Sequence, residues 1–179
     1  MRLLTTTLFA AGLLLPGMAE AGPKYSASTQ KTSSAGEHKP SLAFDGLLST
    51  SWAEDAPGQG TGEWLEVDLG RDVEVETVSI WGGDFSSMEN WKGRSRVAEA
   101  TLSWTGPDGS DDKEIELGDR FGRRDVKIGA TIRTLKIQID EVHEGGIFAD
   151  VHIAEMAFDF GRKADPAYAE AIEAKISRS

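Results

Sequence analysis

Short runs in which apolar and polar residues alternate fill the segment 42–160, and they limit the possible folds more than any other feature of the sequence. The clearest run, TLKIQID, places Leu135, Ile137 and Ile139 on one face and polar side chains on the other. This period of two is typical of a strand with one buried face. Gly, Pro, Asp and Asn separate the runs, and no helical period occurs among them. The sequence therefore predicts an all-β fold, an antiparallel jelly-roll β-sandwich.

One run changes its apolar parity. In VEVETVSIW, Val75 and Val78 are both apolar, although they would lie on opposite faces of a regular strand. Such a switch indicates a β-bulge near Glu76–Thr77. The other predicted strands are 64–70, 97–104, 113–117, 124–128, 134–140 and 151–158.

The start of the chain has the parts of a secretory signal peptide. Arg2 precedes an apolar run at 8–15, Pro16 ends this run, and the triplet AEA offers a cleavage site after Ala21. The run is too short for a transmembrane helix, which needs about 20 apolar residues. We therefore expect export, with the mature protein secreted or periplasmic.

The end of the chain has a different pattern. Asp165 and Pro166 are typical of a helix start, and Tyr168, Ile172 and Ile176 recur every fourth residue after it. A short C-terminal helix is predicted, which either docks on the sandwich or frays. The predicted organisation is a signal peptide at 1–21, a β-sandwich at 22–160 and a helical tail at 161–179.

Composition excludes several classes of partner. The chain has no cysteine, so an exported form has no disulfides, which favours a bacterial envelope protein. Its net charge is −11, whereas phosphate backbones and anionic lipids are bound through Lys and Arg. We expect no nucleic-acid partner and no membrane insertion.

The loop DGLLSTSW holds a candidate cation site. Asp45 and Gly46 form a tight turn, Thr50 supplies a hydroxyl, and Trp52 follows as an apolar anchor. A carboxylate, a hydroxyl and main-chain carbonyls that converge in one loop suit a hard cation such as Ca²⁺. An Asp in such a turn also commonly caps its own backbone, so both interpretations stay open.

Three segments together carry a family resemblance. AFDG-LLST-SW, GEWLEVDLG and ADVHIAEMAFD are similar to the first and last signatures of discoidin, or F5/8 type C, domains. The chain most closely resembles the bacterial branch called the NADase-type glycan-binding domain, over about residues 25–160. The matching residues are Asp45, Gly46, Thr50, Trp52, Glu54, Gly60, Gly62, Glu63, Trp64, Gly82, Arg96, Val142, Gly145, Asp150, Ile153 and Glu155.

The resemblance implies a galactose-binding-like jelly roll with eight strands and, as in many relatives, a structural Ca²⁺. Leu47 departs from the family pattern, because relatives often have a polar residue there. Direct hydrogen bonds among Asp45, Thr50 and Glu155 are the alternative to a metal. The implied ligands are the main-chain carbonyls of Leu42 and Ala154 and the side chains of Asp45, Thr50 and Glu155.

Sugar-binding sandwiches of this type use loops at one end, where an aromatic ring and polar side chains contact the ring and hydroxyls of the sugar. Trp91 lies in the polar loop SSMENWKGRSR, and both an exposed and a buried position stay open for it. Trp52, Trp64, Trp81 and Trp104 lie in or beside strands and are expected in the core. The candidate ligand-binding set is Asp84, Asn90, Trp91, Arg94, Arg96, His143 and Glu144.

The expected function is non-catalytic glycan binding outside the cytoplasm. The three histidines lack the HExxH spacing of a zinc enzyme, and no G-x-S-x-G nucleophile elbow or phosphate loop occurs. A chance pair of carboxylates in a small hydrolase stays open from the sequence alone. The main alternative is an envelope protein-protein interaction or adhesion subunit that uses the same loops or the C-terminal helix.

Overall fold

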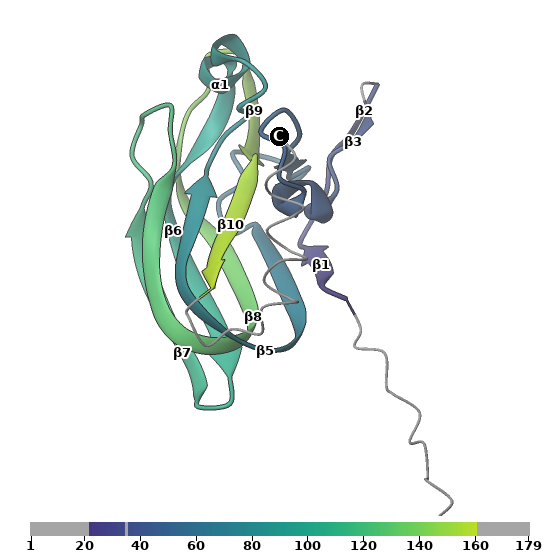
Figure 1. The fold of residues 1–179 in the computed structure, drawn as a ribbon. Helices are drawn as coiled ribbons and strands as arrows, with labels where there is room; N and C mark the ends of the chain where they lie inside the picture. Colours follow the sequence, from purple (N-terminus) through teal and green to yellow (C-terminus); the bar gives the residue numbers. More distant parts are fainter. Residues whose placement is uncertain (1–21, 35, 161–179) are drawn as a thin grey trace, which may run out of the picture.

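The computed structural model describes residues 22–34 and 36–160, and these residues form a curled β-sheet with two short helical turns (Figure 1). The helical turns are η1 (Pro40–Phe44) and α1 (Met88–Gly93). The strands are β1 (Lys24–Ala27), β2 (Thr32–Ser33), β3 (Gly36–Glu37), β4 (Trp52–Ala53), β5 (Trp64–Trp81), β6 (Arg94–Gly106), β7 (Gly109–Glu116), β8 (Arg124–His143), β9 (Phe148–Ile153) and β10 (Glu155–Phe160).

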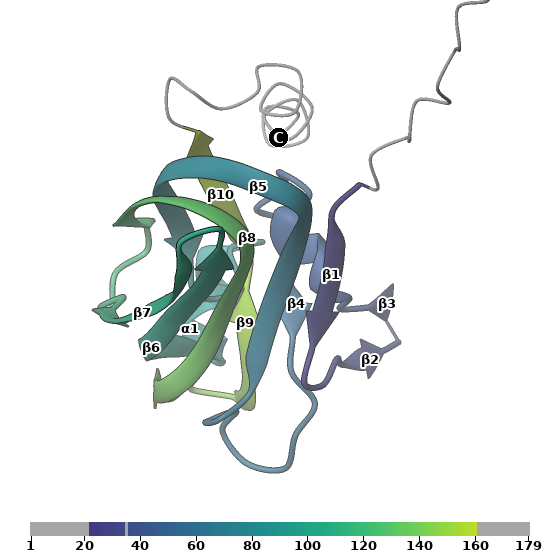
Figure 2. The ribbon, with the colours of Figure 1, turned by 90° about the horizontal axis from the view of Figure 1, so that it is seen from below.

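The main sheet has the strand order β1-β5-β8-β6-β9-β4. Strand β10 pairs with β5 and β7 pairs with β6, whereas β2 and β3 form a small separate hairpin. Every pairing is antiparallel except that of β6 with β9. The long strands β5, β6 and β8 bend, so the sheet wraps around its own core (Figure 2). The prediction of an all-β fold is confirmed.

The predicted bulge is confirmed, but the strand that carries it is longer than expected. The register of β5 against β8 shifts between Val75 and Thr77, and the buried face changes parity there. The runs 64–70 and 73–81 are one strand, because the second register shift, between Asp68 and Val73, bends β5 without ending it. The predicted runs 124–128 and 134–140 likewise belong to the single strand β8.

The predicted strand 151–158 is wrong in one respect, because it divides at Ala154. Its first half, β9, pairs with β4 and β6, whereas its second half, β10, pairs with β5. The amide of Ala154 donates to the carbonyl of Trp81, 2.9 Å away, at the point where the chain changes partners. The change of partner brings Glu155 under the loop that follows η1.

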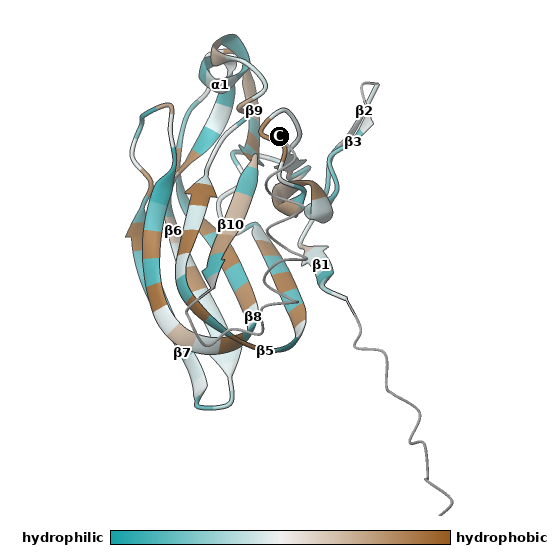
Figure 3. Cartoon of the chain, viewed as in Figure 1, coloured by the Kyte–Doolittle hydropathy of each residue, from teal (hydrophilic) through white to brown (hydrophobic). Residues whose placement is uncertain are grey.

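Apolar and polar residues alternate along the long strands, as the bands of Figure 3 show, and many of the apolar ones are buried. Leu65, Val67 and Leu69 are buried, as the period of two predicts. Trp52 and Trp104 are also buried, whereas Trp64 and Trp81 are only half-buried. Burial of these apolar side chains is the main force that holds a sheet without cysteines together.

Two predicted segments, the signal peptide at 1–21 and the helical tail at 161–179, lie outside the described residues. Within the part of the chain that is described, no helix has the length and apolar character needed to cross a bilayer.

Candidate functional site

One end of the sheet carries a cavity that three of the predicted ligand-binding residues share. Asp84, Asn90 and Arg94 line this cavity of about 310 Å³ from the segment around α1. The opposite wall comes from a segment far away in the sequence, between β2 and β4. The other lining residues are Ser33, Gly36, Glu37, His38, Leu42, Ser49, Thr50, Ser51 and Ser86.

Arg94 is fixed by two carboxylates. Its Nε atom lies 3.0 Å from Oδ2 of Asp84, and its Nη1 donates to Oδ2 of Asp150 at 2.8 Å. The ammonium of Lys31 lies 2.8 Å from the other oxygen of Asp150. Burial alone would raise the pKa of Asp150, but hydrogen bonds from His152 and Lys31 outweigh this effect and hold the pKa well below its usual range. Asp150 therefore stays ionised and keeps Arg94 in place.

Asp84 is held by the turn that leads into α1. Its Oδ1 accepts from the amide of Ser86 at 3.0 Å and from the Ser86 hydroxyl. The side-chain amide of Asn90 donates from Nδ2 to that hydroxyl at 2.9 Å. The hydroxyl of Ser87 caps the helix by accepting from the backbone amide of Asn90. The polar groups of this wall thus have set positions before any ligand arrives.

The structure does not give Trp91 the place of a sugar platform. Its side chain is only 7% exposed, because the guanidinium carbon of Arg96 lies 4.4 Å from its ring centre and Phe121 packs edge-on against it. Phe121 comes from the loop between β7 and β8, a distant segment whose approach to Trp91 no local pattern indicates. We therefore remove Trp91 from the candidate site.

Phe148 is an exposed aromatic residue that the sequence analysis missed. It is 49% exposed, and the guanidinium carbon of Arg94 lies 4.9 Å from its ring centre. The ladder of β6 and β9 pairs Arg94 with Phe148, so the ring stands beside the cavity wall. The only local signal was an aromatic residue directly after the loop sequence GGI.

The remaining predicted residues do not line the cavity. Arg96 is buried, and its Nε and Nη2 both contact Oδ1 of Asp119. His143 ends β8 and faces Arg96 in the β-ladder. Glu144 accepts a hydrogen bond from Gln59 at 2.6 Å. Each of the three has a structural partner or position outside the site.

Behind the cavity, Ser51, His152 and Asp150 form a chain that has the connectivity of a catalytic triad. Oγ of Ser51 lies 2.8 Å from Nδ1 of His152, and Nε2 of His152 lies 3.0 Å from Asp150. Burial lowers the pKa of His152, and so does the charge of Arg94. The hydrogen bond to Asp150 acts on this pKa in the opposite direction but does not outweigh them. The two ring nitrogens are exchanged relative to a Ser-His-Asp triad, in which the serine contacts Nε2 and the acid contacts Nδ1, and His152 is fully buried. These contacts connect the start of β4 with β9.

The predicted cation loop lies along the same wall. Thr50 donates to Asp45 at 2.8 Å, and the amide of Leu47 donates to Asp45 at 2.9 Å. The amide of Gly46 donates to Oε2 of Glu155 at 2.8 Å. The direct hydrogen bonds that the sequence left as an alternative are therefore present for Asp45 with Thr50, whereas Glu155 bonds to the main chain.

These bonds leave one side-chain oxygen of Glu155 without a partner. Glu155 is 2% exposed, and its Oε1 atom has no hydrogen-bond partner among the described residues. Burial, and then the charge of Asp45, raise the pKa of Glu155 to about 8. A buried oxygen without a donor beside a second carboxylate fits a bound cation. In residues 22–34 and 36–160, no group of three or more acidic, His or Cys side chains forms a metal site, so a cation here also needs main-chain carbonyls.

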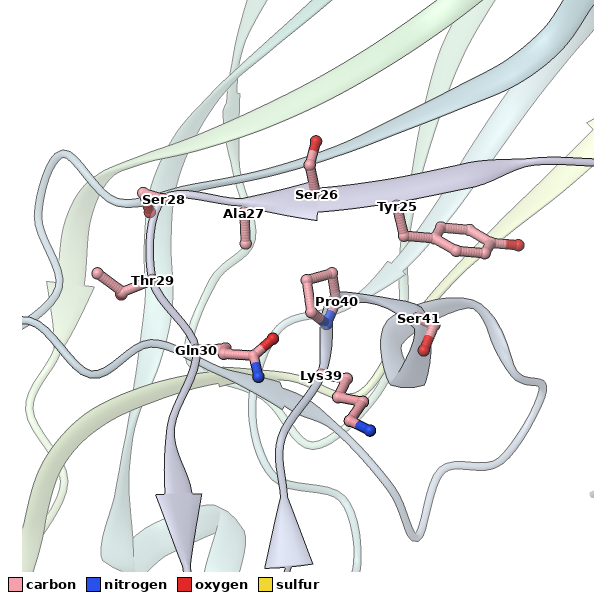
Figure 4. Close-up of a pocket in the computed structure, with 9 residues that line it drawn as sticks. All are labelled: Tyr25, Ser26, Ala27, Ser28, Thr29, Gln30, Lys39, Pro40 and Ser41. Atoms are coloured by element: carbon pink, nitrogen blue, oxygen red, sulfur yellow. The ribbon is translucent and has the colours of Figure 1, made fainter.

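A second, larger cavity of about 540 Å³ opens between β1 and the start of η1 (Figure 4). Residues 25–30 form one side and residues 39–41 the other. Lys39 is the charged residue that lines it, and this side chain pairs with Glu37 at 2.7 Å. None of the predicted site residues lies there, which leaves the cavity at Arg94 as the better candidate.

The fold is that of carbohydrate-binding modules. The family 32 module of NanJ from C. perfringens, in complex with galactose, is 18% identical with a TM-score of 0.58, over 76% of this chain and 92% of that one. The lectin domain of lectinolysin, complexed with Lewis B antigen, is 13% identical with a TM-score of 0.57, over 78% and 94%. The family 32 module of AlyQ, in complex with 4,5-unsaturated mannuronic acid, is 18% identical with a TM-score of 0.53, over 76% and 93%.

At 18% identity or less, these likenesses show the fold alone, which is the predicted galactose-binding-like one. More specifically, the chain belongs to the family described as "NAD glycohydrolase translocation F5/8 type C domain", which it matches over residues 19–159. No curated protein matches the sequence.

Proposed function

We propose that this chain is a non-catalytic glycan-binding module and that the glycan binds in the cavity at Arg94. One observation carries the proposal: Asp84, Asn90 and Arg94 converge on a single cavity, and each is held in place by a hydrogen bond of its own. Phe148 adds an exposed ring beside them. Sugars are bound by such pairings of an aromatic face with fixed polar groups.

The family and the similar structures support this proposal. The family 32 modules and the lectin domain described above are complexed with sugars, and they share this fold over most of their own length. Because their sequence identity is low, the likeness supports the class of ligand through the fold, and the site itself rests on the residues of this chain.

The proposal is tested by a glycan array on the chain without residues 1–21, followed by calorimetry with the sugars that bind. Phe148→Ala and Asn90→Ala should each weaken binding about tenfold, the size expected for a lost stacking or polar contact. Met88→Ala is the matched control, because this exposed side chain lies on α1 but does not line the cavity. An array without any signal, or sugar binding that both variants leave unchanged, would contradict the proposal.

We also propose a structural Ca²⁺ in the loop after η1. The side chains of Asp45, Thr50 and Glu155 and the main-chain carbonyls of Leu42 and Ala154 would hold it. The unpartnered Oε1 of Glu155 supports this site. Bound Ca²⁺ would supply positive charge that offsets the two carboxylates, a role in folding rather than in chemistry.

A second candidate function is a protein-protein interaction at the same end of the sheet. Met88, Phe121, Ile147 and Phe148 are large apolar side chains that are exposed around α1. Exposed apolar groups that gather in one place are typical of interaction surfaces. Co-purification of a single envelope protein, lost in Ile147→Ser but kept in Asn90→Ala, with no sugar signal, would favour this function.

We further propose that the module acts after export, in the periplasm or outside the cell, because the sequence begins with a signal-peptide pattern. Mass spectrometry of the protein from its native host should give a mature N-terminus at Gly22. A cytoplasmic protein that keeps Met1 or Arg2 would contradict this.

A further inference from the structure

We propose that the cavity at Arg94 selects uncharged sugars and rejects sugars that carry a carboxylate. The proposal rests on the glycan-binding function above and adds the chemical class of its ligand. It comes from the balance of charges around the cavity, which the similar structures do not determine, since their ligands include both galactose and an unsaturated mannuronic acid.

The first step concerns Arg94, which is the only Lys or Arg among the described residues that line the cavity. Two of its three nitrogens lie within 3.0 Å of carboxylate oxygens, one from Asp84 and one from Asp150. Its positive charge is therefore already balanced inside the protein. An acidic sugar would have to compete with two fixed carboxylates for the same guanidinium.

The nearby lysines are engaged in the same way. Lys31 lies 2.8 Å from the second oxygen of Asp150, and Lys39 lies 2.7 Å from Glu37. Neither ammonium lines the cavity. The ion pairs thus leave no surplus of positive charge on this side of the described chain with which to bind an anion.

The second step concerns the acids that face the ligand. Asp84 and Glu37 both line the cavity, and the whole chain has a net charge of −11. Each of these carboxylates is already paired, Asp84 with Arg94 and Glu37 with Lys39, so the ion pairs balance. A ligand carboxylate would gain no net attraction from them, and it would approach a chain of net negative charge. Hydroxyl groups have the opposite effect, because they donate to carboxylates and accept from amides such as that of Asn90.

The lining groups therefore match an uncharged sugar. Asp84 offers acceptors, and Asn90 offers both donors and acceptors. Ser33, Ser49 and Ser51 line the cavity with further hydroxyl or main-chain groups. An N-acetyl group is uncharged as well, so N-acetylhexosamines belong to the same class.

The test uses matched pairs of probes on the chain without residues 1–21. Galactose is compared with galacturonic acid, and lactose with 3′-sialyllactose, by calorimetry or NMR titration. The uncharged member of each pair should bind at least about tenfold more tightly. High salt should narrow this ratio, because it screens the repulsion of the acidic member.

A charge variant sharpens the result. Glu37→Gln removes one of the lining carboxylates and should raise the affinity for the acidic probes several-fold relative to the affinity for the uncharged ones. Glu76→Gln is the control, since this carboxylate pairs with Lys127 on β8 and lies outside the cavity.

The outcomes separate the two proposals. Equal or tighter binding of an acidic probe overturns the charge selectivity while glycan binding stands. No binding of any member of either pair, together with an empty glycan array, overturns glycan binding and this inference with it. An increase in acidic-probe affinity in Glu76→Gln as large as in Glu37→Gln would also overturn the role of the lining charges.

Discussion

At the scale of single residues, the position of Arg94 depends on a close approach of two backbones. A Cβ atom at Gly145 would lie 2.3 Å from the carbonyl carbon of Arg94, whereas one at Gly146 would find its nearest neighbour at 3.7 Å. Gly145→Ala should therefore destabilise the fold by about 1–3 kcal/mol and weaken glycan binding. Gly146→Ala should change neither by much. Urea unfolding and sugar titration of both variants test this, and equal stabilities would contradict it.

His152 gives the stability a pH dependence. In the folded chain its neutral ring bridges Ser51 and Asp150, and burial keeps its pKa below the usual value. The unfolded chain binds a proton at about pH 6.5, so it takes up more protons than the folded chain below that pH. The contribution is fully present above pH 6.5 and is lost as the pH falls through the lowered pKa.

The measurement is the free energy of unfolding at several pH values between about 7 and 5. The wild type should lose stability as the pH falls, and His152→Gln should lose less over the same range although it starts from a lower value. A variant with the same slope as the wild type would show that other groups cause the dependence.

Three of the predicted polar residues share one cavity in the structure, whereas the predicted aromatic residue is buried. Asp84, Asn90 and Arg94 were recognisable because they lie close together on one polar loop. Trp91 lies in the same loop, but Phe121 and Arg96 cover it through contacts that depend on the tertiary fold. Phe148 occupies the exposed place instead, and only the pairing of β6 with β9 brings it to Arg94.

At the scale of secondary-structure elements, strands β6, β7 and β8 place like charges opposite each other. Glu99 faces Glu116 on one side and Glu141 on the other, and Glu141, followed by smaller effects, raises the pKa of Glu99. Like charges directly opposite each other destabilise a sheet. Glu99→Gln should therefore raise the melting temperature at low salt, and the gain should shrink at high salt.

Glu76→Gln is the control for this sheet, because Glu76 lies 3.3 Å from the ammonium of Lys127 and not from another acid. This variant should give no gain. If both variants raised the melting temperature equally, the effect would come from the lower net charge of the chain rather than from the three facing acids.

Some features of the strands could be predicted from the sequence, and others could not. The bulge at Glu76–Thr77 could be predicted, because it changes the alternation of apolar and polar residues in the sequence itself. The continuity of β5 and β8 could not, because it depends on how neighbouring strands bend. The division at Ala154 was not readable, since both halves alternate in the same way and only their partners differ.

At the scale of the whole molecule, the loop after η1 joins the two ends of the domain. The bond from Gly46 to Glu155 spans 109 positions of the sequence, and Thr50 of the same loop lines the cavity. A Ca²⁺ in this loop would therefore stabilise the fold and one wall of the site together. At a hundredfold excess over its dissociation constant it should add about 2.7 kcal/mol to the free energy of unfolding.

Calorimetric melting with Ca²⁺ and with a chelator measures this stabilisation. Asp45→Ala and Glu155→Gln should both lose the response to Ca²⁺. Without the metal, Glu155→Gln should be at least as stable as the wild type, because the amide removes a buried acid beside Asp45 while its oxygen can still accept from Gly46. Asp72→Asn, an exposed acid on β5, should keep the full response.

Because Thr50 belongs both to the proposed Ca²⁺ loop and to the cavity wall, Ca²⁺ should also affect sugar binding. Chelation should weaken sugar binding several-fold in the wild type, because it loosens the wall that contains Thr50, and should have no effect in Glu155→Gln. A melting temperature that Ca²⁺ leaves unchanged would contradict the metal site. A wild type that melts higher with Ca²⁺ but binds sugar equally well after chelation would limit the metal to a role in stability.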